Sequence, residues 1–216
     1  MRNRRTALLA TAALAGAASL WGVSATATAA PTATSVLTYD ATGANVPVGA
    51  KLTASLAAGT TAKLTTTASG STGVTCSGSA IEATVATNPT APGTATENSV
   101  KQTFNAATCT SNILGTTGVS SITISPLLTA SVTSAGVLTV NGPITATAVL
   151  KSVFGNVNCV YSAASISGTT NNADDSINFS NQLLTKTSGS TTCPSSSYFT
   201  AKYAPVTGPG GAVSVN

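Results

Sequence analysis

Histidine is absent from this 216-residue sequence, and charged residues make up only 6% of it. Without histidine, the side chains cannot assemble a Ser-His-Asp or Cys-His catalytic arrangement. The S-x-x-K motif of Ser-Lys enzymes, the G-x-S-x-G elbow and the P-loop are missing too. The sequence therefore predicts a non-enzymatic protein with no catalytic residues, no cofactor-binding residues and no cofactor.

Acidic residues are also few, and paired carboxylates are the remaining conventional route to hydrolysis. The candidates are Glu82, Glu97, Asp174 and Asp175. Glu82 is out of phase with the apolar residues of its predicted strand, and Glu97 follows a loop containing proline and glycine. We therefore expect surface acids in contact with solvent, which leaves a carboxylate-based glycan hydrolase as the third-ranked function.

Basic residues give no clustered patch. All three arginines lie within the first five residues, and the six lysines are scattered singly along the rest of the chain. A nucleic-acid site needs clustered Lys and Arg to neutralise phosphates. We expect no nucleic-acid partner, and no membrane partner once the N-terminal segment is removed.

The N-terminal segment has the three zones of a secretory signal. A basic start is followed by an apolar run from Ala7 to about Val23 and by a tail of small residues that includes Ala27-Thr28-Ala29. We predict a signal peptide over residues 1–29 and a secreted or extracellular product, with cell-wall association as a further option. The alternative is a membrane anchor, although the run is short and rich in alanine. The Arg4-Arg5 pair leaves both the twin-arginine and the Sec export routes open.

Four cysteines form an even set, and in an exported chain such sets form disulfides. They are Cys76, Cys109, Cys159 and Cys193. The intervals favour bonds between the first two and between the last two. A zinc site is the alternative, but it would need histidine partners or close C-x-x-C pairs. We therefore predict two local disulfides and no metal site.

Apolar residues alternate with polar ones at strand spacing in many short segments. The clearest segments are residues 46–56, 74–78, 81–85, 100–106 and 199–203. Turn signals separate them, so the predicted fold class is all-β, an antiparallel β-sandwich that is Ig-like or barrel-like. We expect one domain over residues 30–216, and the alternative is two small β halves over about 30–118 and 119–216.

Two polar segments are predicted to be hairpin turns. Asn141-Gly142-Pro143 would reverse the chain between residues 137–140 and 144–150, since Asn-Gly favours tight turns. Residues 171–176 offer several side-chain oxygens that could bind Ca²⁺, but their spacing is not that of an EF-hand and a polar turn explains them. The large aromatic rings are expected to anchor the packing of a core made mostly of small residues.

The C-terminal half contains a moderately specific pattern. Asn158-Cys159-Val160-Tyr161-Ser162 is followed by Ser188-Gly189-Ser190-Thr191-Thr192-Cys193-Pro194 and then by Phe199-Thr200-Ala201-Lys202-Tyr203. With the leader, this pattern resembles secreted, Thr/Ala/Gly-rich proteins of actinobacteria that have no assigned function. The resemblance implies an extracellular β-sandwich with local disulfides, and it implies no catalytic residues.

The leading functional hypothesis is a secreted or cell-wall-associated β module that binds an extracellular protein or a cell-wall glycan through its surface. The first alternative is a carrier of a small apolar ligand, with a cavity lined by residues such as Phe104, Phe154 or Phe179, or an inhibitor of a secreted protease. The sequence alone leaves the partner and the oligomeric state unknown.

Overall fold

The computed structural model describes residues 33–125 and 127–216, so the predicted signal peptide lies outside the described residues. Residues Ala33–Asn216 form one compact unit. The unit contains fifteen strands in its described part and one short 3₁₀ helix, η1 (Ala106–Thr108). The strands are β1 (Leu37–Tyr39), β2 (Lys51–Ser55), β3 (Ala62–Thr65), β4 (Gly73–Cys76), β5 (Ser79–Thr87), β6 (Thr94–Phe104), β7 (Cys109–Ser111), β8 (Thr116–Ser125), β9 (Leu128–Thr133), β10 (Val137–Ser152), β11 (Gly155–Asn171), β12 (Ser176–Gly189), β13 (Ser196–Tyr203), β14 (Thr207–Gly208) and β15 (Gly211–Val215).

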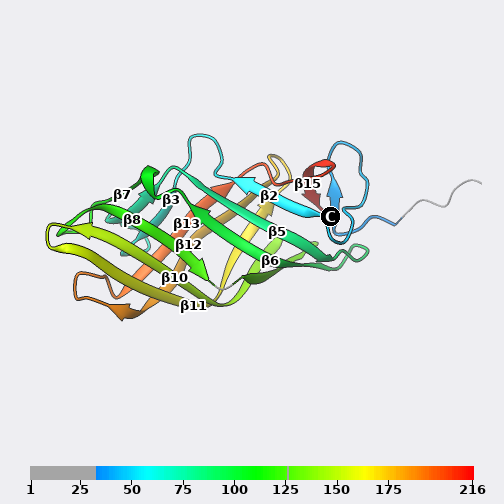
Figure 1. Ribbon diagram of the computed structural model, residues 1–216. Helices are drawn as coiled ribbons and strands as arrows, with labels where there is room; N and C mark the ends of the chain where they lie inside the picture. The colour runs from blue at the N-terminus through cyan, green and yellow to red at the C-terminus, as the bar shows by residue number, and fades with distance from the viewer. Residues whose placement is uncertain (1–32, 126) are drawn as a thin grey trace, which may run out of the picture. The chain divides into compact units, whose positions relative to one another are not determined.

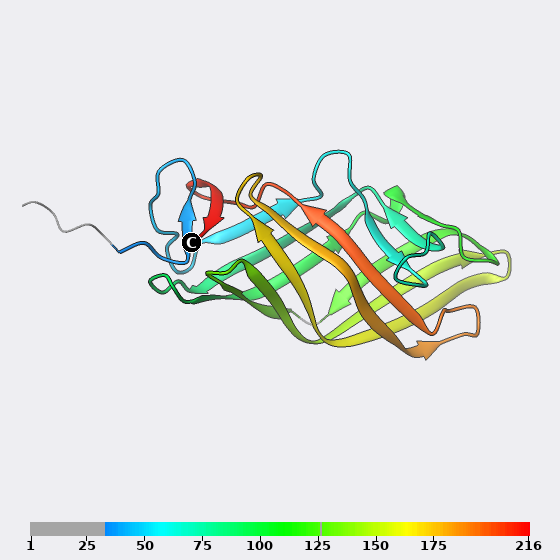
Figure 2. The same cartoon turned by 180° about the vertical axis from the view of Figure 1, so that it is seen from behind.

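The strands form an antiparallel sheet that curls around a common interior. Its order is β1-β15-β14-β2-β5-β6-β8-β10-β11-β12-β13-β3-β4-β7, and β9 pairs with both β6 and β10. A bridge between Leu56 and Tyr203 joins the end of β2 to β13. Figure 1 shows β5, β6 and β10 in front of β12 and β13, and Figure 2 shows the opposite side. The predicted all-β antiparallel class is confirmed.

Strands from the two ends of the sequence are hydrogen-bonded to each other. β3 pairs with β13, and β14 pairs with β2, so early and late strands share one sheet. Within the described residues, no helix is long and apolar enough to cross a membrane.

Alternation of side chains decides what enters the interior. On β13 every second residue is buried, including Phe199, Ala201 and Tyr203, so the alternation predicted for this segment is confirmed. Most buried positions elsewhere are alanine, valine, leucine or isoleucine, and the rings of Phe179 and Phe199 meet at a centroid distance of 5.6 Å. The rings of Phe179, Phe199 and Tyr203 thus anchor the packing of a core whose other side chains are mostly aliphatic.

The predicted hairpin around Asn141-Gly142-Pro143 is wrong, because these residues lie within the single strand β10. Asn141 pairs with Ser165 of β11 and Ile144 pairs with Ala163, so three steps on β10 match two on β11. The extra residue forms a β-bulge, which bends a strand without reversing it. A Cβ on Gly142 would lie 2.9 Å from the Ala163 carbonyl oxygen, so the close approach of the backbones requires glycine there. The turn predicted at residues 171–176 is confirmed, because β11 ends at Asn171 and β12 begins at Ser176.

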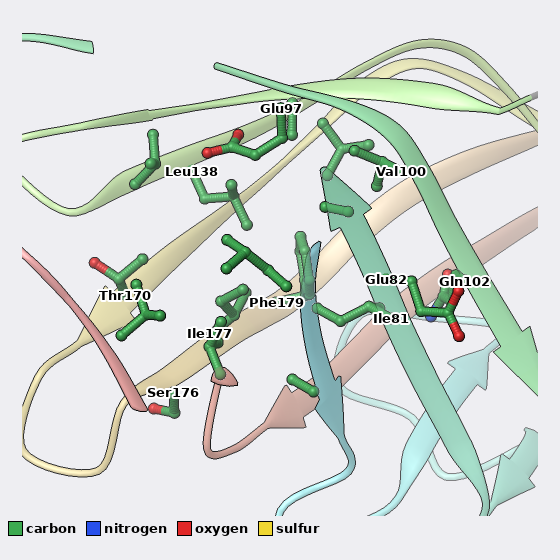
Figure 3. A pocket seen from close by; sticks show the side chains of 18 of the residues that line it. Ile81, Glu82, Glu97, Val100, Gln102, Leu138, Thr170, Ser176, Ile177 and Phe179 are labelled. Atoms are coloured by element: carbon green, nitrogen blue, oxygen red, sulfur yellow. The ribbon is translucent and has the colours of Figure 1, made fainter. Parts of the chain in front are cut away.

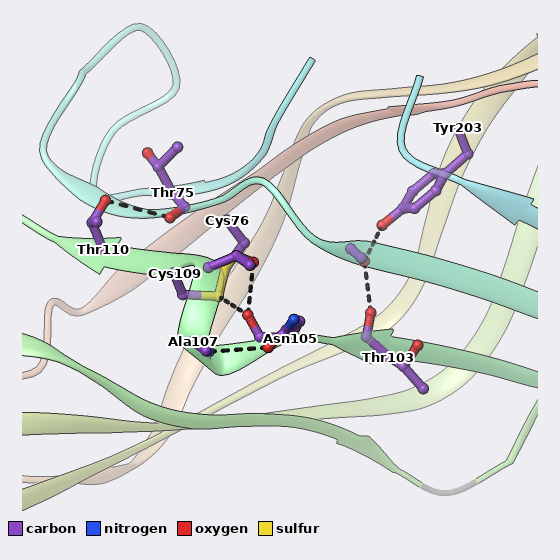
Figure 4. The surroundings of a disulfide bond; sticks show 10 residues. Thr75, Cys76, Thr103, Asn105, Ala107, Cys109, Thr110 and Tyr203 are labelled. Carbon is purple, nitrogen blue, oxygen red and sulfur yellow. Dashed lines mark hydrogen bonds between the residues drawn. A yellow bond between two sulfur atoms is a disulfide. The ribbon is translucent and has the colours of Figure 1, made fainter. Parts of the chain in front are cut away.

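The two predicted disulfides are confirmed. Cys76 bonds to Cys109, and Cys159 bonds to Cys193. The first bond joins the paired strands β4 and β7, and Figure 4 shows its surroundings. The second bond joins Cys159 of β11 to Cys193 in the loop between β12 and β13. Disulfides of this kind persist in oxidising surroundings, which suggests an extracellular environment.

A buried hydrogen-bond network crosses the interior beside the first disulfide. The Tyr203 side chain is fully buried, and its Oη lies 2.9 Å from Ser79 Oγ. Gln102 Nε2 donates to the same Oη at 2.6 Å, and Ser79 Oγ lies 2.8 Å from the Thr103 carbonyl oxygen. The network satisfies these buried polar groups, as stability requires.

Removal of one disulfide is expected to lower the free energy of unfolding substantially. The loops closed by the bonds have sequence separations of 33 and 34 residues, and closing loops of that length stabilises a fold by about 3 to 4 kcal/mol in the chain-entropy description. Urea unfolding of the double variant Cys159→Ala/Cys193→Ala measures this loss. Thr191→Ala, an exposed change in the same loop, is the control and should leave the midpoint unchanged. A loss below about 1 kcal/mol in the double variant would contradict the expectation.

Candidate ligand cavity

An apolar cavity of about 120 Å³ lies inside the curled sheet, in the half that contains β2, β5, β6 and β9. Aliphatic side chains from several strands line it, and Figure 3 shows part of this lining. The aliphatic lining includes Leu52, Ile81, Leu128, Val132, Leu138 and Ile144. A second cavity of about 20 Å³, near Tyr161 and Leu184, occupies the other half of the interior.

The carboxyl group of Glu97 is the exceptional feature of the larger cavity. Glu97 is only 6% exposed, and in Figure 3 its carboxyl group extends from β6 toward Leu138. Its Oε2 is the one buried side-chain oxygen or nitrogen without a hydrogen-bond partner among residues 33–125 and 127–216. A buried unpaired polar group costs stability, so an unsatisfied carboxyl in an apolar cavity points to a binding role.

A β-bulge in β6 directs Glu97 inward. Glu97 pairs with Ala130 and Val100 pairs with Leu128, so three steps on β6 match two on β9. The bulge contains Ser99, whose φ of 52° lies in the left-handed region. Because of the extra residue, both Glu97 and Val100 face the interior, although strict alternation would place them on opposite faces.

Burial shifts the ionisation of this carboxyl. Removal of the charged form from water raises the pKa of Glu97 from its ordinary value of 4.5 to about 7. At neutral pH the group is therefore divided between its charged and its neutral form. Titratable groups with strongly shifted pKa values in apolar pockets are candidates for functional sites.

The expectation that Glu97 is a solvated surface acid is thus wrong, whereas Glu82 is exposed as expected. The two acids differ because Glu82 is on the exposed side of β5, whereas the bulge that follows Glu97 in β6 turns its side chain inward. Glu82 borders the cavity, but its side chain is on the exposed side of β5, whereas Glu97 is buried. The structure therefore does not bring the two carboxylates to a common reaction centre.

The two neighbouring aspartates lie at the turn between β11 and β12. Asp174 is exposed and forms an ion pair with Lys202, and hydrogen bonds from Lys202 and Ser176 lower its pKa. Asp175 is half-buried, and partial burial together with the charge of Asp40 raises its pKa. Ser214 Oγ lies within hydrogen-bond distance of both Asp40 (3.0 Å) and Asp175 (3.3 Å).

This turn also contributes residues to the cavity lining. Asn171 and Asn172 line the cavity and are exposed, and half-buried Asp175 lies beside them. No cluster of three or more potential metal ligands of the types His, Cys, Asp and Glu occurs in the described part of the chain.

Of the three rings named from the sequence as candidate lining residues, only Phe179 lines the cavity. Phe104 packs against the core elsewhere, and Phe154 is 97% exposed at the turn between β10 and β11. The expectation that every large ring anchors packing is therefore wrong for Phe154. Nothing in the sequence indicated that Glu97 is buried, apart from the Asn98-Ser99 pair that forms the bulge.

Glu97 is expected to make stability fall as pH rises. Because its folded-state pKa is raised, its stabilising contribution is complete below about pH 4.5 and is lost as pH rises through about 7. The shift corresponds to about 3 kcal/mol between these limits. The unfolding free energy of the wild type, measured from pH 4 to pH 8.5, should therefore fall relative to that of Glu97→Gln as pH rises, because glutamine does not ionise. Glu82→Gln is the matched control and should keep the wild-type profile; an identical profile for Glu97→Gln would contradict a buried carboxyl.

Comparisons with known proteins add no assignment. No protein-family model matches the sequence. No curated protein matches it. No solved structure matches the fold. The likeness to secreted actinobacterial proteins stays a prediction, and the cavity itself has to supply the evidence about function.

Proposed function

We propose that this protein is a non-enzymatic extracellular carrier that binds a small, predominantly apolar ligand inside its curled sheet. The observation that carries the proposal is an apolar cavity containing one buried carboxyl group without a partner. Apolar pockets with one or two placed polar groups are the usual form of small-ligand sites. The disulfides and the predicted leader support secretion, and the C-terminal pattern supports an actinobacterial origin.

Size and polarity both favour an apolar ligand. Cavities of about 150 Å³ lined by aliphatic and aromatic side chains stay dry and bind benzene. The present cavity has about 120 Å³, which is close to that size. The ligand gains contacts that the cavity walls otherwise lack, and the Glu97 carboxyl fixes its orientation.

Filling the cavity should abolish ligand binding. Ala130 lies on β9 opposite Glu97 and lines the cavity, so Ala130→Leu places a larger side chain in the space. Toluene binding, followed by NMR shifts or calorimetry, should weaken by at least about tenfold in this variant because the ligand and the new side chain compete for one volume.

The matched control for this experiment is Ala146→Leu, which makes the same change beside the smaller cavity. That variant should bind toluene as the wild type does. Toluene binding that is undetectable in the wild type, or unaffected by Ala130→Leu, would contradict the carrier proposal.

Surface contact is the second candidate function, and a separate observation favours it. Leu114 is 94% exposed and Phe154 is 97% exposed, with exposed Val153 beside the latter. Thr116 pairs with Ser152, so the loop before β8 and the turn between β10 and β11 lie at the same end of the sheet, as Figure 1 shows. Exposed apolar side chains gathered at a tip are typical of contact sites for a protein or glycan partner.

Removing the ring at this tip should weaken retention on isolated cell wall. We expect Phe154→Ser to lower the retained fraction severalfold, because the exposed ring supplies the largest apolar contact area at the tip. Val48→Ser, which alters an exposed apolar residue elsewhere, should be retained like the wild type. Equal retention of all three proteins, or no retention of any, would count against the surface-contact function.

A further inference from the structure

The ionisable residues that line the large cavity are all acids. They are Glu97, whose carboxyl is buried, Asp175, which is half-buried, and Glu82, which is exposed to solvent on β5; the described lining contains neither lysine nor arginine. Because solvent screens Glu82, the negative charge that a ligand meets in the cavity comes from Glu97 and Asp175. A cavity of this charge repels a ligand carboxylate and attracts a cation or a strong hydrogen-bond donor. Among apolar ligands small enough for the cavity, the charge of the lining therefore favours those that carry a cation or a strong hydrogen-bond donor.

Other charged groups on the surrounding strands do not compensate the Glu97 carboxyl. Lys51 on β2 and Lys101 on β6 lie on the exposed side of the sheet. Lys202 is paired with Asp174, and Lys186 Nζ donates to the Cys193 carbonyl oxygen at 3.0 Å. Lys151 on β10 is exposed. In the part of the chain that the structure describes, the only salt bridge is the one between Lys202 and Asp174.

The surroundings of Asp175, which lines the cavity, have the same sign of charge. Asp40 and Asp175 both face Ser214 there, and neither forms an ion pair in the described chain. Two neighbouring carboxylates raise the local concentration of cations over that of anions. A cationic ligand would thus meet negative charge at the turn after β11 as well as at Glu97 inside.

We propose that the ligand is an apolar amine whose ammonium group pairs with the Glu97 carboxylate while its apolar part fills the cavity. This inference rests on the carrier function proposed above and specifies its ligand class. The desolvation of the carboxyl has already occurred on folding, so binding desolvates only the amine. The ammonium group supplies the hydrogen-bond donor that Oε2 lacks.

Proton linkage follows from this pairing. The amine binds the ionised carboxyl, so binding below about pH 7 must first release the Glu97 proton. The logarithm of the association constant should therefore rise by about one per pH unit up to about pH 7 and then level off. A neutral apolar ligand should bind with no such rise.

Four probes with the same ring test the ligand class: toluene, benzyl alcohol, benzylamine and benzoate. At pH 8 benzylamine should bind the full protein on the order of tenfold more tightly than benzyl alcohol, as expected for a charge-assisted hydrogen bond. Benzoate should bind least. At pH 5 the preference for the amine should disappear.

Variants separate this inference from the carrier function. Glu97→Gln should still bind toluene but lose the preference for benzylamine, whereas Glu82→Gln should keep it. If toluene does not bind the wild type, the carrier function itself fails. If toluene binds but benzylamine is no tighter than benzyl alcohol, if benzoate binds most tightly, or if Glu97→Gln keeps the preference, the amine inference is overturned and the carrier function stands.

Discussion

Side-chain alternation on a sheet that curls back on itself is the constraint on which this structure depends. Away from the bulges, strands such as β13 send every second residue to the interior, and the bridge between Leu56 and Tyr203 joins β13 to the end of β2 around that interior. Since the inward residues are mostly small, they fill a wide enclosure only where large rings such as Phe199 and Tyr203 project into it. A cavity remains beside Phe179 and Phe199, and aliphatic side chains from several strands complete its lining.

Local sequence rules predicted most of the scaffold. The alternation of Phe199, Ala201 and Tyr203 identified β13, and the spacing of the four cysteines identified both disulfides, because each depends on residues close in sequence. The curling of the sheet was not predictable in detail, since it depends on pairing between β3 and β13 and between β2 and β14, which are far apart in the chain.

Both principal errors of sequence interpretation arise from bulges. Asn141-Gly142-Pro143 has the composition of a tight turn. However, β10 pairs with β11 both before and after these residues, so the strand bends there without reversing. Glu97 is three residues before inward-facing Val100, so strict alternation would place it on the outer face of the sheet. The bulge at Asn98-Ser99 adds one residue and so places Glu97 on the inner face. The turn composition at residues 141–143 and the Pro/Gly loop before Glu97 were the grounds of the two predictions, and neither reveals a bulge. The second bulge is where the candidate site lies.

The account depends on the buried state of one carboxyl group in an apolar cavity. The most direct measurement is an NMR titration of the Glu97 side-chain carboxyl carbon in the free protein and with benzylamine bound. We expect a midpoint of about 7 in the free protein, because burial raises the pKa, and a lower midpoint when the amine is bound. A midpoint near the ordinary value of 4.5 in the free protein, unchanged by benzylamine, would contradict the account.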